Sequence, residues 1–197
     1  MPKIVDADER RREIAEALWR LAMRQGLEAA SLSAVAAEAG VSKGRLQHYF
    51  ASREEMLLFA VGYANERLDE RVRRRLAEQT DPRPMAAVRA LVLALLPVDE
   101  ESRTGALVNV AFFIRALATP ALSDTFRRGS AELLRKISGY LREARESGEF
   151  AAGLDVEQEA KVLLALAGGL SSGMLMGGTS AEEATATLDH HLARLRP

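Results

Sequence analysis

The chain has 197 residues, a formal net charge of −1 and no cysteine. Hydrophobic residues make up 48% and charged residues 28% of the sequence, which is ordinary for a folded globular protein and argues against disorder. The missing cysteines exclude disulfides, thiol catalysis and cysteine metal sites. Because the net charge is close to zero, a nucleic-acid partner would need a locally basic face on this protein.

The sequence carries no evident targeting or metal-binding signal. Its N-terminal stretch has no apolar signal core, so we expect a cytoplasmic protein. Segment 162–181 is uncharged over roughly the 20 residues of a membrane span. Its many glycines and serines and the lack of flanking aromatic residues favour a helix buried between proteins instead. His190 and His191 diverge on a helix and have no third ligand nearby, so we expect no metal and no cofactor.

Apolar residues recur at spacings of three and four along most of the chain, which predicts an all-α protein of about nine helices. An amphipathic run over 14–22 is expected to end at Gly26, and Ser31 and Ser42 are expected to cap two short helices. Ser52 and Glu55 predict a capping box at the start of a long helix to about residue 78. Further helices are expected at 85–96, 99–118, 120–145 with a break near Gly129, 155–176, and 180–195 with a second capping box.

The most informative stretch is residues 31–53, SLSAVAAEAGVSKGRLQHYFASR. Two short helices are joined there by a tight turn in which Gly40 must adopt a positive φ, a conformation that glycine reaches at little cost. Val41 is apolar and can fill the gap between the two helices. This layout is typical of a helix-turn-helix, whose second helix enters the major groove of DNA.

The charge distribution agrees with this interpretation. Residues 1–53 contain nine Lys or Arg and seven Asp or Glu, a net of +2 in a chain whose total is −1. From Gly40 to Arg53 there are Lys43, Arg45 and Arg53 and no acidic residue. A basic patch without acids is what contact with phosphates requires.

Residues 11–57 resemble the N-terminal domain of TetR-type transcriptional regulators. The strongest match is the pattern of Ala36, the run Ala39–Gly44, Leu46, the run His48–Phe50, Ser52, and Glu54 or Glu55. The C-terminal part, 146–195, is similar to the BetI-like branch of these regulators. The resemblance implies an N-terminal three-helix helix-turn-helix domain over 1–53 that binds DNA. It also implies a helical domain over 54–197 that binds an effector and dimerises.

We assign the DNA-contacting residues as hypotheses. Arg45 can address guanine and Gln47 can address adenine; the family often has threonine and tyrosine at these two positions. Lys43 is expected at base edges or nearby phosphates, and Leu46 and Phe50 are expected to point inward. Residues expected to hold the phosphate backbone are Ser33, Ser42, Gly44 through its backbone N–H, His48, Tyr49 and Arg53.

The family resemblance implies an effector cavity in the C-terminal domain. A BetI-like regulator suggests choline, whose quaternary ammonium favours an aromatic cage. The only tryptophan, however, is Trp19 in the DNA-binding part, and the later tyrosines are Tyr63 and Tyr140. We therefore expect a small-molecule effector that is largely apolar. The candidate lining residues are Phe59, Tyr63, Leu91, Leu95, Asn109, Phe112, Phe113, Arg115, Leu134 and Ile137.

Specific binding needs more contacts than one two-turn helix offers, so a homodimer on a palindromic operator is expected. The glycine- and serine-rich helix over 155–176 offers a surface on which two helices can approach closely, and the last helix carries a matching leucine stripe. The candidate interface residues are Leu163, Leu166, Gly169, Leu170, Gly173, Leu188 and Leu192.

The resulting hypothesis is a DNA-binding transcriptional regulator that represses by occupying its operator and is released by a small molecule. One alternative is a helical small-molecule-binding protein whose DNA-binding head is vestigial, and another is an activator. An enzyme is not expected, because no nucleophile–base pair, phosphate loop or metal-ligand spacing is visible.

Overall fold

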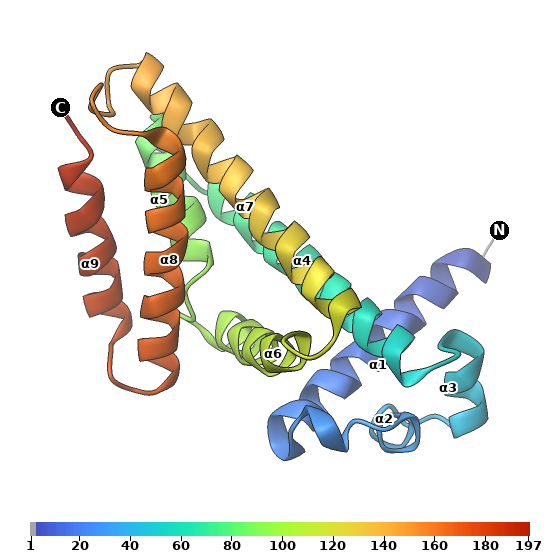
Figure 1. The fold of residues 1–197 in the computed structure, drawn as a ribbon. Coiled ribbons are helices and arrows are strands. Elements are labelled where there is room, and N and C mark those ends of the chain that lie inside the picture. Colours follow the sequence, from blue (N-terminus) through green and yellow to red (C-terminus); the bar gives the residue numbers. More distant parts are fainter. Residues whose placement is uncertain (1–2) are drawn as a thin grey trace. The chain divides into compact units, whose positions relative to one another are not determined.

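The computed structural model describes the backbone of residues 3–197 and the side chains of residues 7–197. All regular structure in this range is helical, which confirms the expected all-α fold (Figure 1). The helices are α1 (Lys3–Gln25), α2 (Leu32–Glu38), α3 (Lys43–Tyr49), α4 (Arg53–Ala77), α5 (Pro84–Ala94), α6 (Glu100–Ala116), α7 (Pro120–Glu146), α8 (Val156–Leu175) and α9 (Ala181–Arg194), with a single 3-10 turn at Leu27–Ala29.

Side-chain caps set the starts of the short helices as expected. Ser31 Oγ accepts a hydrogen bond from the Ala34 N–H at 3.1 Å, and Ser42 Oγ accepts one from the Arg45 N–H at 3.2 Å. Each bond satisfies a backbone donor that the first turn of a helix leaves without a partner. The capping box that opens α9 is also present, with reciprocal bonds between Ser180 and Glu183.

Two helix boundaries differ from the expected ones. Helix α1 already begins at Lys3, well before the apolar run that predicts it. Helix α7 continues without a break through Gly129. A glycine inside a helix costs about 1 kcal/mol relative to alanine, and the long amphipathic face of α7 outweighs that cost.

The chain forms two compact units. The head unit runs up to Glu66 and includes Leu107–Phe126, and the body unit comprises Arg67–Ala106 and Arg127–Pro197. Each unit has its own apolar core. Fully buried side chains of the head core include Leu18, Leu46, Phe50 and Phe112, and those of the body core include Leu91, Ile137, Leu141, Leu163 and Leu188.

The uncharged segment 162–181 forms most of α8 and the turn to α9. Leu163 and Ala167 are buried in the body core, whereas Val162 and Met176 are 44% and 86% exposed. The segment is therefore one-sided, with one face buried within the chain and another left open. None of the helices in the described part of the chain is long and apolar enough to cross a membrane.

The turn between α2 and α3 has the predicted geometry. Gly40 adopts a φ of +67°. Its N–H donates to the Ala37 carbonyl at 3.2 Å, and the next N–H, of Val41, donates to the Ala36 carbonyl at 2.9 Å. These bonds satisfy the last carbonyls of α2 and reverse the chain within three residues.

Replacing Gly40 by alanine is expected to lower the free energy of unfolding by about 1–2 kcal/mol, because an L side chain is disfavoured in the left-handed region. Chemical denaturation followed by circular dichroism would measure the change. The control is Gly44→Ala, at a helical position where an added Cβ meets nothing within 4 Å. This control is expected to raise stability by about 0.5–1 kcal/mol, and equal effects at the two glycines would contradict the assignment.

Candidate nucleic-acid interface

Helix α3 is held to the head unit by one apolar face. Leu46 is fully buried, and so is Phe50, the residue that ends the helix. Val41, at the turn, is half-buried against the same core. The predicted inward orientation of Leu46 and Phe50 is thus confirmed, and it leaves the opposite side of α3 facing outward.

Helix α3 carries most of the predicted DNA-contacting residues, and most of these are exposed. Lys43 and Arg45 form no ion pair with any other described side chain, so their charges are available to a partner. Tyr49 is half-buried, and its ring meets the His48 ring edge-on with centroids 5.5 Å apart. The remaining exposed members are Ser42, Gly44, Gln47 and His48 on or beside α3, and Ser33 on α2.

Arg53 differs from the other predicted residues, because its guanidinium is engaged inside the head unit. Its Nε donates to the Ala30 carbonyl at 2.9 Å and its Nη2 to the Leu27 carbonyl at 2.8 Å. Glu28 lies 3.7 Å from the same Nη2. Arg53 thus fastens the first turn of α4 to the segment that precedes α2, and its expected phosphate contact stays a prediction.

The acidic residue of α2, Glu38, is neutralised by two arginines of α1. Arg20 Nε donates to Glu38 Oε1 at 3.2 Å, and Arg24 binds both carboxylate oxygens. Hydrogen bonds from Arg24 and Arg20 lower the pKa of the Glu38 carboxyl below its ordinary value. The carboxylate therefore fastens α1 to α2, and its charge is balanced within the head unit.

The residues expected to line an effector cavity are divided between the two units. In the head unit, Phe112 is buried, Phe113 is 51% exposed and Asn109 is exposed. Tyr63 stacks on Trp19, with ring centroids 5.0 Å apart and planes 10° apart. Phe59 packs on Phe50, and Arg115 pairs with Glu28 at 3.4 Å.

In the body unit, Leu91 and Ile137 are core residues, and Leu95 and Leu134 are half-buried against that core.

A groove with several charged side chains lies elsewhere in the body unit, lined by α5, the segment before it and helix α9. It has a volume of about 430 Å³. Arg89 crosses it to bind Asp189 through two hydrogen bonds of 2.5 and 2.9 Å, and Arg83 binds Asp81. The groove includes none of the expected effector residues, and its charges are already largely paired with one another.

The expected pairing surface is only partly free. Leu163, Leu188 and Leu192 are buried in the body core, so they support α8 and α9 from within the chain instead of facing a partner. Leu166, Leu170 and Gly173 are half-buried, and Gly169 is exposed. Open residues that sequence reasoning missed are Val162 and Ala165 of α8 and Met176, which follows its last turn; Ser172 of the glycine- and serine-rich stretch is open as well.

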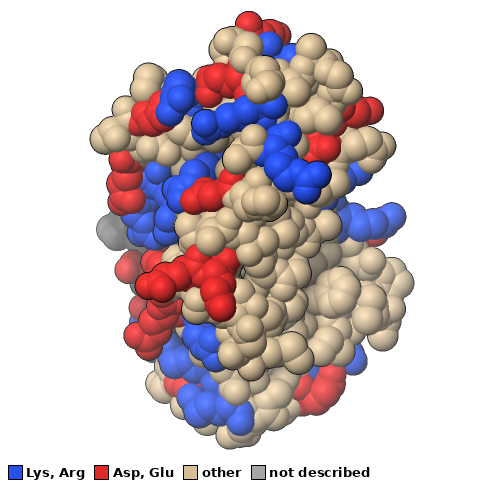
Figure 2. All heavy atoms as spheres, turned by 90° about the vertical axis from the view of Figure 1, so that its left-hand side faces the viewer, with Lys and Arg blue, Asp and Glu red and all other residues tan. Residues whose placement is uncertain are grey.

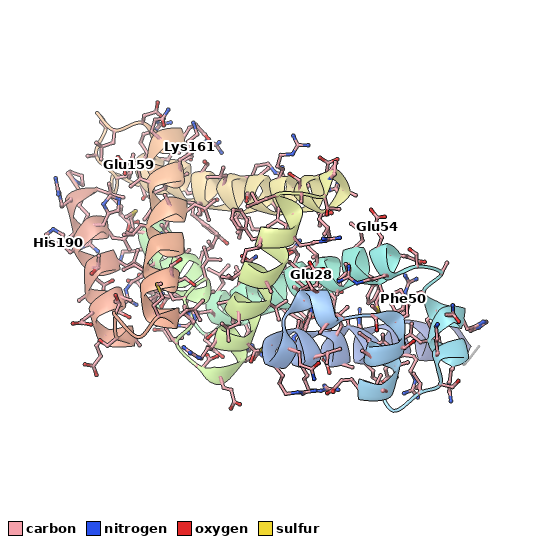
Figure 3. The ribbon with its side chains drawn as sticks, turned by 60° about the horizontal axis from the view of Figure 1, so that its bottom comes forward. Glu28, Phe50, Glu54, Glu159, Lys161 and His190 are labelled. Atoms are coloured by element: carbon pink, nitrogen blue, oxygen red, sulfur yellow. The ribbon has the colours of Figure 1, made fainter. Side chains whose placement is uncertain are left out.

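Figure 2 views the molecule from the side of α8 and α9. Uncharged residues form a continuous area in the centre and lower right of this view, whereas Lys, Arg, Asp and Glu are frequent in its upper part and on its left side. On α9, His191 Nε2 lies 3.4 Å from Glu159 Oε2 of α8. In Figure 3, Glu159 and Lys161 mark the beginning of α8, and His190 marks the outer side of α9. An uncharged face on paired helices is suited to contact with another protein surface.

The exposed basic helix on a helix-turn-helix scaffold defines a DNA-binding protein, and comparisons with known proteins name its family. Residues 14–60 match the family model "Bacterial regulatory proteins, tetR family". Residues 84–197 match the model "BetI-type transcriptional repressor, C-terminal". The chain therefore belongs to the TetR family of transcriptional regulators, with a C-terminal part of the BetI type.

Individual relatives agree with this assignment. The HTH-type transcriptional regulator PksA of Bacillus subtilis is 34% identical over 171 residues, which cover 87% of this chain and 81% of PksA. A crystal structure of a transcriptional regulator from Rhodococcus sp. Rha1 is 30% identical, with a TM-score of 0.80 and coverage of 94% and 95%. A regulator from Saccharomonospora viridis, solved in complex with choline, shares the fold at 24% identity, with a TM-score of 0.85 and coverage of 94% and 96%.

These relatives are regulators and not enzymes. The expected function is confirmed at this level: the chain is a DNA-binding transcriptional regulator of a family whose members bind small-molecule effectors and typically form dimers.

The pKa shift of Glu38 predicts a pH-dependent contribution to stability. A carboxyl whose pKa is lowered in the folded state stabilises the fold above its ordinary value and loses that effect as the pH falls through the lowered pKa. Glu38→Gln is expected to lower the melting temperature at pH 7 by about 1–3 °C, and the difference from the unmodified protein is expected to shrink as the pH falls through the lowered pKa of Glu38.

Thermal melts by circular dichroism at pH 7 and pH 3 would measure this difference. Glu9→Gln is the control, because Glu9 is exposed on α1 and forms no ion pair with any described residue. A melting-temperature difference for Glu38→Gln that is the same at both pH values would show that its hydrogen bonds to Arg20 and Arg24 do not stabilise the head unit.

Proposed function

We propose that this regulator is a dimeric repressor that occupies a palindromic operator and is released by a largely apolar small molecule. The observation that carries the proposal is the outward side of α3, where Lys43 and Arg45 are exposed and unpaired among the described residues. No acidic residue lies between Gly40 and Arg53 to oppose them. Such a surface attracts phosphate, and DNA is the partner that the family binds.

Each exposed residue of α3 has a proposed part in reading DNA. Arg45 addresses guanine through O6 and N7, and Gln47 addresses adenine through N6 and N7. Lys43 contacts a base edge or an adjacent phosphate. The backbone N–H of Gly44 and the side chains of Ser33, Ser42, His48 and Tyr49 hold the phosphate backbone, which fixes the orientation of α3 in the groove. Arg53 is assigned to the phosphate backbone as well, with its Nε and Nη2 fixed by the carbonyls of Ala30 and Leu27.

The proposed dimer brings two recognition helices to one side of the duplex. Helix-turn-helix dimers bind half-sites about 34–36 Å apart, one helical turn of DNA, so a twofold protein selects an inverted repeat. The open face of α8 supports this pairing, because Gly168, Gly169 and Ser172 allow close approach and Val162 and Met176 supply apolar area. Occupancy of a promoter by such a dimer excludes polymerase.

The proposed effector is largely apolar, in preference to choline. A quaternary ammonium ion is recognised by several aromatic faces. The body unit contains two aromatic residues, Tyr140 and Phe150, and Phe150 is buried in its core. Trp19 and Tyr63 stack on each other in the head unit. Helix α4 runs from the head unit into the body unit, and it offers a covalent route by which effector binding would tilt α3 away from its groove.

DNA recognition is tested by two substitutions with different signatures. Arg45→Ala is expected to cost about 1–3 kcal/mol on the preferred sequence and to relax discrimination at one base pair. Lys43→Ala, if Lys43 binds phosphate, is expected to weaken binding to all sequences and to reduce the salt-dependence slope by about 1. Titration of operator and random duplexes at several salt concentrations separates the two effects. An unchanged base preference in Arg45→Ala would remove that residue from base reading.

The pairing surface is tested by a charge placed on the open face of α8. Gly169→Arg adds a side chain where a Cβ meets nothing within 4 Å, so the subunit fold is expected to persist. The variant is expected to shift the protein from dimer to monomer in analytical ultracentrifugation and to lose operator binding by at least about tenfold. The matched control is Gly139→Arg on α7, another position with open space around the Cβ. A dimer that persists in Gly169→Arg would place the interface elsewhere.

A further inference from the structure

Arg11 of α1 reaches the junction between the recognition helix and the next helix. Its guanidinium carbon lies 4.7 Å from the centroid of the Phe50 ring and 4.6 Å from that of the Phe59 ring. Phe50 ends α3, and Phe59 belongs to α4. The two rings are 5.4 Å apart with planes at 60°. Figure 3 labels Phe50 at this junction and Glu54 on the first turn of α4. One cation thus contacts an aromatic ring from each helix.

The same guanidinium is tied to the backbone between the two helices through Glu55. Arg11 Nη2 donates to Glu55 Oε1 at 3.1 Å, and Glu55 Oε2 accepts the Ala51 N–H at 2.8 Å. The Glu55 N–H in turn donates to Ser52 Oγ at 3.1 Å. The capping box expected here is therefore displaced by one residue, because the carboxylate reaches Ala51 instead of the Ser52 N–H. Arg11, Glu55 and Ser52 together fix the three-residue connection from α3 to α4.

The environment of Arg11 is unusual for an arginine that only supports the fold. Its Nε is buried and has no hydrogen-bond partner among the described residues, although the side chain as a whole is 30% exposed. A buried donor without a partner is unfavourable, and an aliphatic side chain would fill the same space without that penalty. A planar guanidinium, in contrast, can stack on rings from two helices and bind a carboxylate at the same time. Arginine at position 11 therefore fixes two rings and a carboxylate relative to one another, although it leaves a buried N–H donor without a partner in the described part of the chain.

We propose that Arg11 is a positioning residue that sets the angle between α3 and α4, and that it thereby restricts the half-site spacing that the dimer accepts. The inference rests on the proposed dimeric function. In such a dimer, α4 connects each recognition helix to the rest of its subunit. A junction without Arg11 allows α3 a wider range of angles, so operators with altered spacing are bound almost as well as the preferred one.

The test compares spacing preference in Arg11→Met and Arg12→Met. Arg12→Met removes the same charge from the neighbouring position, where Arg12 lies 5.8 Å from the Tyr63 ring and 3.6 Å from Glu66 and is 53% exposed. An inverted repeat selected by the unmodified protein from random duplexes is titrated beside versions with one base pair added or removed between the half-sites. The unmodified protein and Arg12→Met are expected to prefer the selected spacing on the order of tenfold, and Arg11→Met about threefold or less.

The measured quantity is the ratio of the affinity for the selected spacing to the affinity for an altered spacing. This ratio distinguishes a change in the orientation of α3 from a loss of protein stability. A variant that is merely less stable has a smaller active fraction, which weakens its binding to all duplexes equally and leaves the ratio unchanged. Arg11→Lys keeps the charge but lacks the planar fork, so its ratio is expected to fall as well; it serves the same comparison if Arg11→Met does not fold.

Two results would overturn the inference, and they differ in what else they overturn. A ratio near tenfold in both Arg11 variants would show that Arg11 does not set the spacing, and would leave the proposed function intact. If the unmodified protein selects no inverted repeat, the proposed function fails first, and the positioning role of Arg11 fails with it.

Discussion

The burial of Leu46 and Phe50 is the constraint on which the DNA-binding surface depends. Helix α3 has seven residues, and isolated helices shorter than about 12–15 residues are marginal in water. Its structure must therefore come from packing, and these two fully buried side chains supply it. Because one side of so short a helix is committed to the core, the other side has only a few positions. Those positions hold Lys43, Arg45 and Gln47, so the reading surface is a direct consequence of how the helix is anchored.

Local features of the head unit could be predicted from the sequence because their causes are local. The caps at Ser31 and Ser42 and the positive φ at Gly40 each depend on residues within a few positions of one another. The inward orientation of Leu46 follows from helical spacing. The same holds for the basic patch, since the absence of acids between Gly40 and Arg53 can be read directly from the letters.

What could not be predicted depends on contacts between residues far apart in the chain. Arg11 meets Glu55 across 44 positions, and its neighbours Arg10 and Arg12 give the same signal in the sequence. The hydrogen bonds of Arg53 to the carbonyls of Leu27 and Ala30 also join residues more than 20 positions apart, and no local pattern predicts them. Leucine stripes on α8 and α9 were expected at an interface between subunits, yet Leu163 and Leu188 are buried within one chain. An apolar periodicity identifies a face that is covered but not the molecule that covers it.

The stacking of Trp19 on Tyr63 has a practical consequence. Trp19 is the only tryptophan, and its ring lies against a residue of α4. Near-ultraviolet excitation selective for indole therefore observes a single site, the contact between α1 and α4 in the head unit. The fluorescence of Trp19 can therefore report a rearrangement of that contact when a partner binds, without an attached dye.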